Sequence, residues 1–150
     1  AIRILVVDDH PVLRDGVAAI LETQSDMTLV GEARDGADAI VRFRELKPDV
    51  TLMDLQMPGL GGVEAITAIR AEFPNARILV LTTYDGDVQA VRAIKAGAVG
   101  YMVKDCTTEE LVRTIRQAAN GETALSPDIA ASMIEEMNAA AAAGRRSVRR

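Results

Sequence analysis

The sequence predicts an α/β fold in which a doubly wound parallel sheet of five strands carries helices on both faces. Short apolar runs rich in Val, Ile and Leu alternate with longer segments whose apolar residues recur every three or four positions. The first pattern is typical of buried parallel strands, and the second of amphipathic helices. Because the two patterns alternate five times along the chain, we expect strands joined by crossover helices.

Five apolar runs predict the strands. They are short and rich in β-branched residues, which suit strands that are buried on both faces. In chain order they are Ile2–Val7, Thr28–Glu32, Val50–Asp54, Ile78–Leu81 and Val99–Val103. The third run ends in a single carboxylate, Asp54, and the turn residues Pro58 and Gly59 follow it closely.

Each of these runs is followed by a segment with helical spacing of its apolar residues. Pro11 suits the first turn of the first helix, Lys47-Pro48 stops the second, and Gly97 suits the end of the fourth. A fifth helix begins near Thr107. The predicted helices cover about residues 11–23, 37–46, 63–72, 88–96 and 107–119, with a last one from Ser126 through Met137.

Composition excludes several classes of protein. Hydrophobic residues make up 49% of the 150 residues, which is enough for one domain with a sizeable core and an appendage. No apolar run approaches the roughly 18 residues of a membrane span, and the chain does not open with a signal pattern. A single cysteine, Cys106, cannot form an internal disulfide. We therefore expect a soluble cytoplasmic protein that does not contact a membrane.

The charge of the chain is unevenly distributed. The net charge is −5, yet the only charges after Asn138 are Arg145, Arg146, Arg149 and Arg150, so the remainder carries −9. An acidic body is a poor surface for nucleic acid. We expect the body to bind a cation or a protein, and the tail to be a separate piece with only weak evidence for DNA contact.

Polar side chains stand where four of the predicted strands end: Asp8 and Asp9, Asp54, Thr82 and Lys104. Parallel strands bring their carboxyl ends to one edge, so these groups should converge. Three crowded carboxylates repel by about 1 kcal/mol per pair even at 4 Å in water, and Mg²⁺ would relieve this. Lys104 and the Thr82 hydroxyl add donors for phosphoryl oxygens. The set predicts a phosphoryl-transfer site; strand-end capping by each group separately is the alternative.

Over residues 2–121 the chain resembles the receiver domains of bacterial two-component response regulators. The stretches that carry the resemblance are Val6-Val7-Asp8-Asp9, Met53-Asp54-Leu55-Gln56-Met57-Pro58, Leu81-Thr82-Thr83 and Gly100-Tyr101-Met102-Val103-Lys104. It implies a flavodoxin-like sheet with strand order 2-1-3-4-5. It further implies a receiver domain at residues 1–121 and a helical linker and tail at 122–150.

The resemblance implies a role for each site residue. Asp54 would accept a phosphoryl group from a sensor histidine kinase. Asp8, Asp9, Asp54 and the backbone carbonyl of Gln56 would bind Mg²⁺ or Mn²⁺. The only catalysis implied is self-phosphorylation from a phosphodonor and slow autodephosphorylation, so we do not expect an enzyme in the usual sense.

The remaining implied roles concern the switch. Lys104 would pair with the phosphoryl group, Thr82 would move towards it, and Tyr101 would turn inward behind it. Many receivers have Pro after the lysine, whereas Asp105 stands there in this chain. The geometry of the Lys104–Asp105 bond therefore stays open.

Three short motifs resemble the NarL/FixJ branch of the family: Asp9-His10-Pro11, Thr82-Thr83-Tyr84 and Lys104-Asp105. That branch carries a C-terminal helix-turn-helix of the LuxR type. We expect transcription regulation through a DNA-binding domain that this chain lacks, and a homodimer when the receiver is phosphorylated.

Two other functions stay open. A stand-alone receiver would act through protein contacts, although Ser126–Gly144 looks like a linker to an output domain. An aspartate-nucleophile phosphatase also uses strand-end carboxylates and Mg²⁺, but its Asp-x-Asp-x-Thr pattern follows the first strand. Here Asp8-Asp9-His10 follows the first strand, and the candidate nucleophile follows the third.

Four residues have simpler readings. His10, the only histidine, is expected to open the first helix with Pro11 rather than to serve as a second phosphoacceptor. Cys106 is expected to be an ordinary thiol. Met133 and Met137 lie one helical turn apart and are expected to be packing or linker residues.

Overall fold

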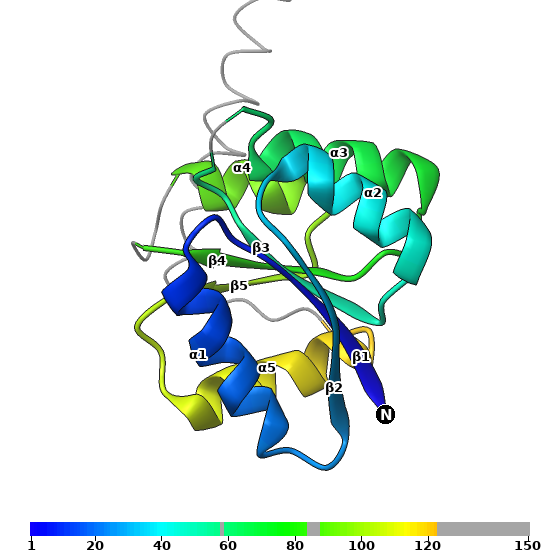
Figure 1. Cartoon of the computed structure of the whole chain (residues 1–150). Helices are drawn as coiled ribbons and strands as arrows, with labels where there is room; N and C mark the ends of the chain where they lie inside the picture. Colours follow the sequence, from blue (N-terminus) through cyan, green and yellow to red (C-terminus); the bar gives the residue numbers. More distant parts are fainter. Residues whose placement is uncertain (58, 84–87, 123–150) are drawn as a thin grey trace, which may run out of the picture.

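Five parallel strands form one sheet in the order β2-β1-β3-β4-β5, as Figure 1 shows. The strands are β1 (Ile2–Val7), β2 (Met27–Ala33), β3 (Val50–Asp54), β4 (Ile78–Thr82) and β5 (Gly100–Val103). The structure is a computed structural model that describes residues 1–57, 59–83 and 88–122. The predicted fold class and strand order are confirmed.

Five helices follow the strands in turn. They are α1 (Pro11–Glu22), α2 (Gly36–Leu46), α3 (Gly62–Glu72), α4 (Val88–Ala96) and α5 (Thr108–Ala119). In Figure 1, α1 and α5 cover one face of the sheet, and α2, α3 and α4 cover the other. In the part of the chain that the structure describes, none of the helices has the length and apolarity needed to cross a membrane.

Local sequence signals explain where three of these helices begin or end. Pro11 occupies the first turn of α1, where its missing N–H is not needed. Lys47 ends α2 in a left-handed conformation with φ 45°, directly before Pro48. At α5 the Thr107 side chain accepts from the Glu110 N–H, and the Glu110 side chain accepts from the Thr107 N–H. This capping box fixes the start of α5 directly after the loop that carries Lys104.

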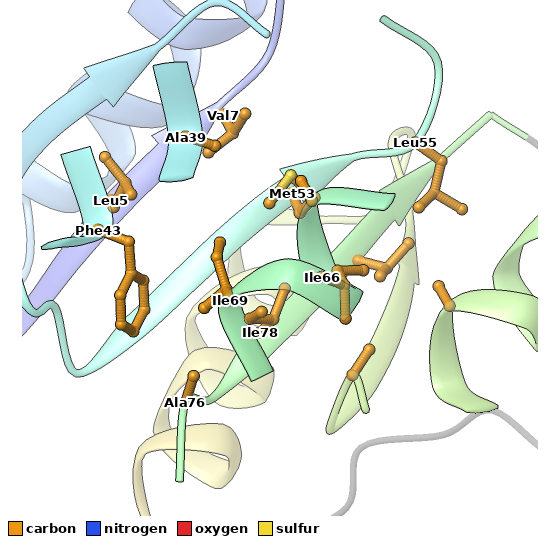
Figure 2. Packing of buried hydrophobic residues seen from close by; sticks show 14 of the residues in the cluster. Leu5, Val7, Ala39, Phe43, Met53, Leu55, Ile66, Ile69, Ala76 and Ile78 are labelled. Carbon is orange, nitrogen blue, oxygen red and sulfur yellow. The ribbon is translucent and has the colours of Figure 1, made fainter. Parts of the chain in front are cut away.

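The core lies on both faces of the sheet, because alternate residues of each strand point in opposite directions. Towards α1 and α5 lie Ile4, Val6, Leu52 and Leu79, all fully buried. Figure 2 shows the other face, where Met53 and Ile78 of the sheet pack with Ile66 and Ile69 of α3. β3 and β4 are buried along their whole length. A polar side chain at the end of either strand is therefore held by rigid surroundings.

The boundaries differ from the predicted ones by a few residues. β2 is longer at both ends than the predicted Thr28–Glu32, and its pairing with β1 shifts where Ile4 lies beside Leu29 but Leu5 lies beside Gly31. Such a bulge breaks the regular alternation that predicts a strand from sequence. The last helix, the Met133–Met137 pair and the arginine tail all lie outside the described residues. These predictions and the domain limit at residue 121 stay predictions.

Candidate metal centre

The polar groups that end the strands meet at one edge of the sheet. Val7, the residue before Asp8, lies beside Met53, the residue before Asp54. Across the sheet Asp54 lies beside Leu81, and Thr82 beside Val103, the residue before Lys104. The parallel register therefore produces the predicted convergence of Asp8, Asp54, Thr82 and Lys104.

Two buried carboxylates share one ammonium group at this edge. Asp8 is fully buried and Asp54 is 1% exposed. Lys104 Nζ lies 3.1 Å from Asp54 Oδ1 and 3.3 Å from Asp8 Oδ2. The shorter contact has the larger part in holding Lys104, because Asp8 Oδ2 has no partner in hydrogen-bond geometry among the described residues. One positive charge thus offsets two negative charges that lie away from water.

The two oxygens of Asp54 have different surroundings. Oδ1 accepts the Gln56 N–H at 3.2 Å and contacts Lys104. Oδ2 is buried and has no hydrogen-bond partner among the residues that the structure describes. A buried anionic oxygen without a partner is costly. Asp54 Oδ2 is therefore the atom that a cation or a reacting group would satisfy.

These surroundings shift the acid–base behaviour of both residues. Burial raises the pKa of Asp54, and the charge of Asp8 raises it further; Lys104 and the Gln56 N–H oppose this only in part. Burial alone would lower the pKa of Lys104, but the hydrogen bond to Asp54 and the charges of Asp54 and Asp8 outweigh it and raise that pKa. Lys104 is therefore held as a cation.

Asp9 and His10 complete the cluster. His10 Nδ1 lies 2.9 Å from Asp8 Oδ1 and 3.0 Å from Asp9 Oδ1. The His10 N–H also donates to Asp8 Oδ1 at 2.8 Å. Asp8, Asp9, His10 and Asp54 each offer one ligand atom, and these atoms all lie within 4.8 Å of one another.

This donor set fits a hard divalent cation. Three carboxylates converge, and one oxygen each of Asp8, Asp9 and Asp54 is buried without a hydrogen-bond partner in the described part of the chain. Carboxylate oxygens are the ligands that Mg²⁺ and Mn²⁺ prefer. The predicted fourth group, the Gln56 carbonyl, stays a prediction, since the contact that the structure gives for Gln56 is its N–H on Asp54.

Two residues of the predicted switch are also near this edge. Thr82 is 3% exposed, and its carbonyl accepts the Lys104 N–H at 2.7 Å, so β4 positions the lysine loop. Tyr101 is 3% exposed and belongs to the core cluster on the α2–α4 face. The ring therefore lies inward in this structure. The described residues contain no cis peptide bond, so the Lys104–Asp105 bond is trans.

A pocket of about 400 Å³ lies beside the metal centre, between α1 and the start of α5. Its lining is mainly apolar, with Leu13, Val17 and Leu111 among its walls, and it includes His10, Lys104 and Cys106. Burial raises the pKa of the Cys106 thiol, and the charges of Glu110 and Asp105 raise it further. A raised pKa agrees with the expectation of an ordinary thiol, which stays a prediction.

Sequence reasoning found Asp8, Asp9, Asp54, Thr82 and Lys104 as the polar groups of this edge, but it gave His10 only a place at the start of α1. His10 is the residue before α1, yet its side chain makes no cap hydrogen bond. The ring turns to the carboxylates instead. The available signal was its position directly after Asp8-Asp9.

A protein-family model describes the same part of the chain: the response regulator receiver domain model matches residues 4–116. The transcriptional regulatory protein YxjL of Bacillus subtilis is 45% identical over 135 residues, which are 90% of this chain and 62% of YxjL. The response regulator VraR of Staphylococcus aureus is 38% identical over 136 residues, which are 91% of this chain and 65% of VraR. The chain thus spans somewhat less than two thirds of the length of these relatives.

Solved structures agree in fold and sequence. A LuxR-family two-component response regulator from Aurantimonas sp. has a TM-score of 0.83 and 42% identity, covering 91% of this chain and 98% of that one. The signal receiver domain of the putative response regulator NarL from Mycobacterium tuberculosis has a TM-score of 0.76 and 37% identity, covering 81% of this chain and 98% of that one. The chain therefore belongs to the response regulator receiver domain family, and its relatives are two-component response regulators of the LuxR/NarL type.

Proposed function

We propose that Asp54 is the phosphoacceptor of this receiver and takes its phosphoryl group from a sensor histidine kinase. The observation that carries the proposal is the state of Asp54 at the end of β3: it is 1% exposed, paired through Oδ1 with Lys104, and has one oxygen without a hydrogen-bond partner in the described part of the chain. Capping of a strand end would leave neither a partly buried lysine nor an orphaned oxygen beside it.

The residues divide the work of phosphoryl transfer. Oδ1 of Asp54 is held by Lys104 and Gln56, which orients the carboxylate and leaves Oδ2 to attack phosphorus. A phosphorus–oxygen bond to Asp54 forms as the phosphorus–nitrogen bond to the kinase histidine breaks, and the histidine leaves with the bonding electrons. Lys104 stays protonated and would pair with the phosphoryl oxygens.

Asp8, Asp9 and Asp54 would hold Mg²⁺ or Mn²⁺, with the Gln56 carbonyl as a further ligand. The bound ion supplies positive charge to the phosphoryl oxygens. Self-phosphorylation from a phosphodonor and slow loss of the phosphoryl group are the only catalysis that we propose for the chain.

We also propose that phosphorylation controls a DNA-binding output and dimerisation. The names of the relatives support this: YxjL is named an uncharacterized transcriptional regulatory protein, and the Aurantimonas relative is of the LuxR family. Thr82 and Tyr101 would transmit the conformational change that follows phosphorylation. The protein would act in the cytoplasm. The DNA-binding domain would belong to the full-length regulator. A stand-alone receiver that acts through protein contacts is the alternative.

The test is phosphorylation by acetyl phosphate with Mg²⁺, followed by intact mass measurement. Wild type should gain one phosphoryl group, and Asp54→Ala should gain none. Asp15→Ala removes an exposed carboxylate of α1 and should be labelled like wild type. Asp9→Ala and EDTA should each reduce labelling. Equal labelling of Asp54→Ala and wild type would overturn the assignment.

A further inference from the structure

We propose that His10 is a direct ligand of the divalent cation at this site, through Nδ1, and that it makes the site favour a first-row transition-metal ion over Mg²⁺. The inference rests on the cation site of the proposed function and adds the fourth side chain of the cluster to it. A carboxylate triad alone would favour hard ions without such a preference.

The position of the imidazole is the first support. Adjacent ligands of an ion with bonds of about 2.1 Å lie about 3 Å apart when they meet at right angles. His10 Nδ1 lies 2.9 Å from Asp8 Oδ1 and 3.0 Å from Asp9 Oδ1. His10 Nδ1 thus lies from each of these two carboxylate oxygens at the spacing of neighbouring ligands of one ion.

The hydrogen-bond inventory is the second support. Nδ1 carries at most one proton, so it can donate to one of the two carboxylates. It has hydrogen-bond contact with Asp8 Oδ1. Among the residues that the structure describes, Asp9 Oδ1 is then left buried without such a partner, together with Asp8 Oδ2 and Asp54 Oδ2. A cation satisfies several of these oxygens at once, and the imidazole lone pair then faces the ion as well.

The backbone of His10 is fixed for this role. Its N–H donates to Asp8 Oδ1 at 2.8 Å, and its backbone is extended, with φ −100° and ψ 110°, before α1 begins at Pro11. The side chain is 65% exposed, so an ion can reach the imidazole from solvent. The ring does not contribute a cap bond to α1, so its replacement should leave the helix intact.

The chemistry of the donor sets the preference. Imidazole nitrogen suits zinc, copper, iron and nickel, whereas carboxylate oxygen suits magnesium, calcium and manganese. Affinity for a mixed nitrogen and oxygen site rises from Mn²⁺ through Co²⁺ to Ni²⁺. His10 should therefore strengthen binding of Co²⁺ and Ni²⁺ most, that of Mn²⁺ less, and change Mg²⁺ binding little.

The chain offers a sharp test, because His10 is its only histidine. Tag-free protein is prepared with histidine labelled with ¹⁵N and loaded with Mn²⁺, and the couplings of Mn²⁺ to nitrogen are measured by pulsed electron paramagnetic resonance. Direct ligation predicts a nitrogen coupling that changes from ¹⁴N to ¹⁵N on labelling and disappears in His10→Ala. Titration should show Co²⁺ and Ni²⁺ binding weakened about tenfold in His10→Ala, with Mn²⁺ binding weakened less and Mg²⁺ binding nearly unchanged.

The outcomes separate this inference from the proposed function. Mn²⁺ that binds without a coupling sensitive to the histidine label, with the same affinity in His10→Ala, overturns the ligand assignment, and phosphorylation of Asp54 can still stand. A histidine coupling in a protein that acetyl phosphate does not label supports the ligand and overturns the phosphoacceptor. Protein that binds no Mn²⁺ overturns the metal site and the inference together. His10→Phe, with circular dichroism as the folding control, should repeat the result of His10→Ala.

Discussion

Lys104 Nζ lies 3.1 Å from Oδ1 of Asp54, although the two residues end strands that β4 separates in the sheet. The same ammonium group reaches Asp8 at the end of β1, 3.3 Å away. One flexible side chain thus spans the carboxyl ends of three strands. In the absence of a divalent ion it is the positive charge that makes two buried carboxylates tolerable, so its role in stability can be measured apart from phosphorylation.

Lys104→Met should destabilise the metal-free protein. The substitution keeps an apolar stem and removes the charge, which leaves Asp54 and Asp8 buried without compensation. We expect the free energy of unfolding, measured with urea at pH 7 in EDTA, to fall by on the order of 2 kcal/mol. Mg²⁺ should restore part of the loss by binding the folded state. Arg113→Met on the exposed face of α5 is the control; an equal loss there would remove the special role of Lys104.

Asp54→Asn should stabilise the metal-free protein, and increasingly so as pH rises. Burial and Asp8 raise the pKa of Asp54 above its ordinary value of 3.8. As pH rises past that value the unfolded chain releases the proton first, so the folded chain binds more protons than the unfolded one. The free energy of unfolding contributed by this group is therefore fully present below the ordinary pKa and is lost as pH rises through the folded pKa.

The measurement is urea unfolding in EDTA at several pH values between about 4 and 7, the range above the ordinary carboxyl pKa. The asparagine side chain of the variant does not titrate. The difference in free energy of unfolding between the variant and wild type should therefore grow with pH. Asp15→Asn, which replaces an exposed carboxylate of α1, should show a small and nearly constant difference. An advantage of Asp54→Asn that stays level or shrinks towards pH 7 would contradict the raised pKa.

Much of the site could be predicted because its positions follow from strand ends. Asp8, Asp54 and Lys104 each follow an apolar run, and parallel strands bring such ends together whatever the loops do. The direction of the His10 ring was not predictable in this way. The ring direction depends on the contacts of His10 with the carboxylates of Asp8 and Asp9. The spacing of apolar residues does not predict the rotamer of a polar side chain.

Two further features depended on tertiary contacts. The bulge in β2 at Val30 follows from pairing with β1, and a regular pattern of apolar residues does not encode it. The inward position of Tyr101 in the α2–α4 core follows from the space left by its neighbours. Sequence could name Tyr101 as a switch residue, through the resemblance, but could not say which position the ring takes.

Gly62→Ala should damage the site through the backbone of the phosphoacceptor strand. A Cβ on Gly62, at the start of α3, would lie 2.5 Å from the carbonyl oxygen of Asp54 and 2.8 Å from Cα of Leu55. Both are backbone atoms, so α3 or the end of β3 must move. We expect a loss of about 1–3 kcal/mol in the free energy of unfolding and slower labelling of Asp54 by acetyl phosphate.

Gly16→Ala is the matched control for that prediction. Gly16 lies inside α1, and a Cβ there would meet nothing within 4 Å. Alanine should stabilise the protein by about 0.5–1 kcal/mol, because glycine loses more backbone freedom on folding. Urea unfolding of both variants gives the comparison. If both substitutions shift stability in the same direction, the close approach of Gly62 to Asp54 does not restrict that position.

Beryllofluoride, a mimic of the acyl phosphate, should convert wild type with Mg²⁺ from monomer to dimer in analytical ultracentrifugation, and Thr82→Ala should respond much less. Thr82 ends β4 beside the lysine loop and is 3% exposed, and we expect its hydroxyl to donate to a phosphoryl oxygen on Asp54. Reversing a population from 1:99 to 99:1 takes about 5.5 kcal/mol. Hydrogen bonds to charged groups contribute about 1.5–3 kcal/mol each, so a few of them suffice and the loss of one should be visible.

Thr83→Ala, on the exposed neighbour, should respond like wild type. Wild type that stays monomeric with the mimic bound would show that this chain does not dimerise by itself, while a full response of Thr82→Ala would show that the signal takes another route.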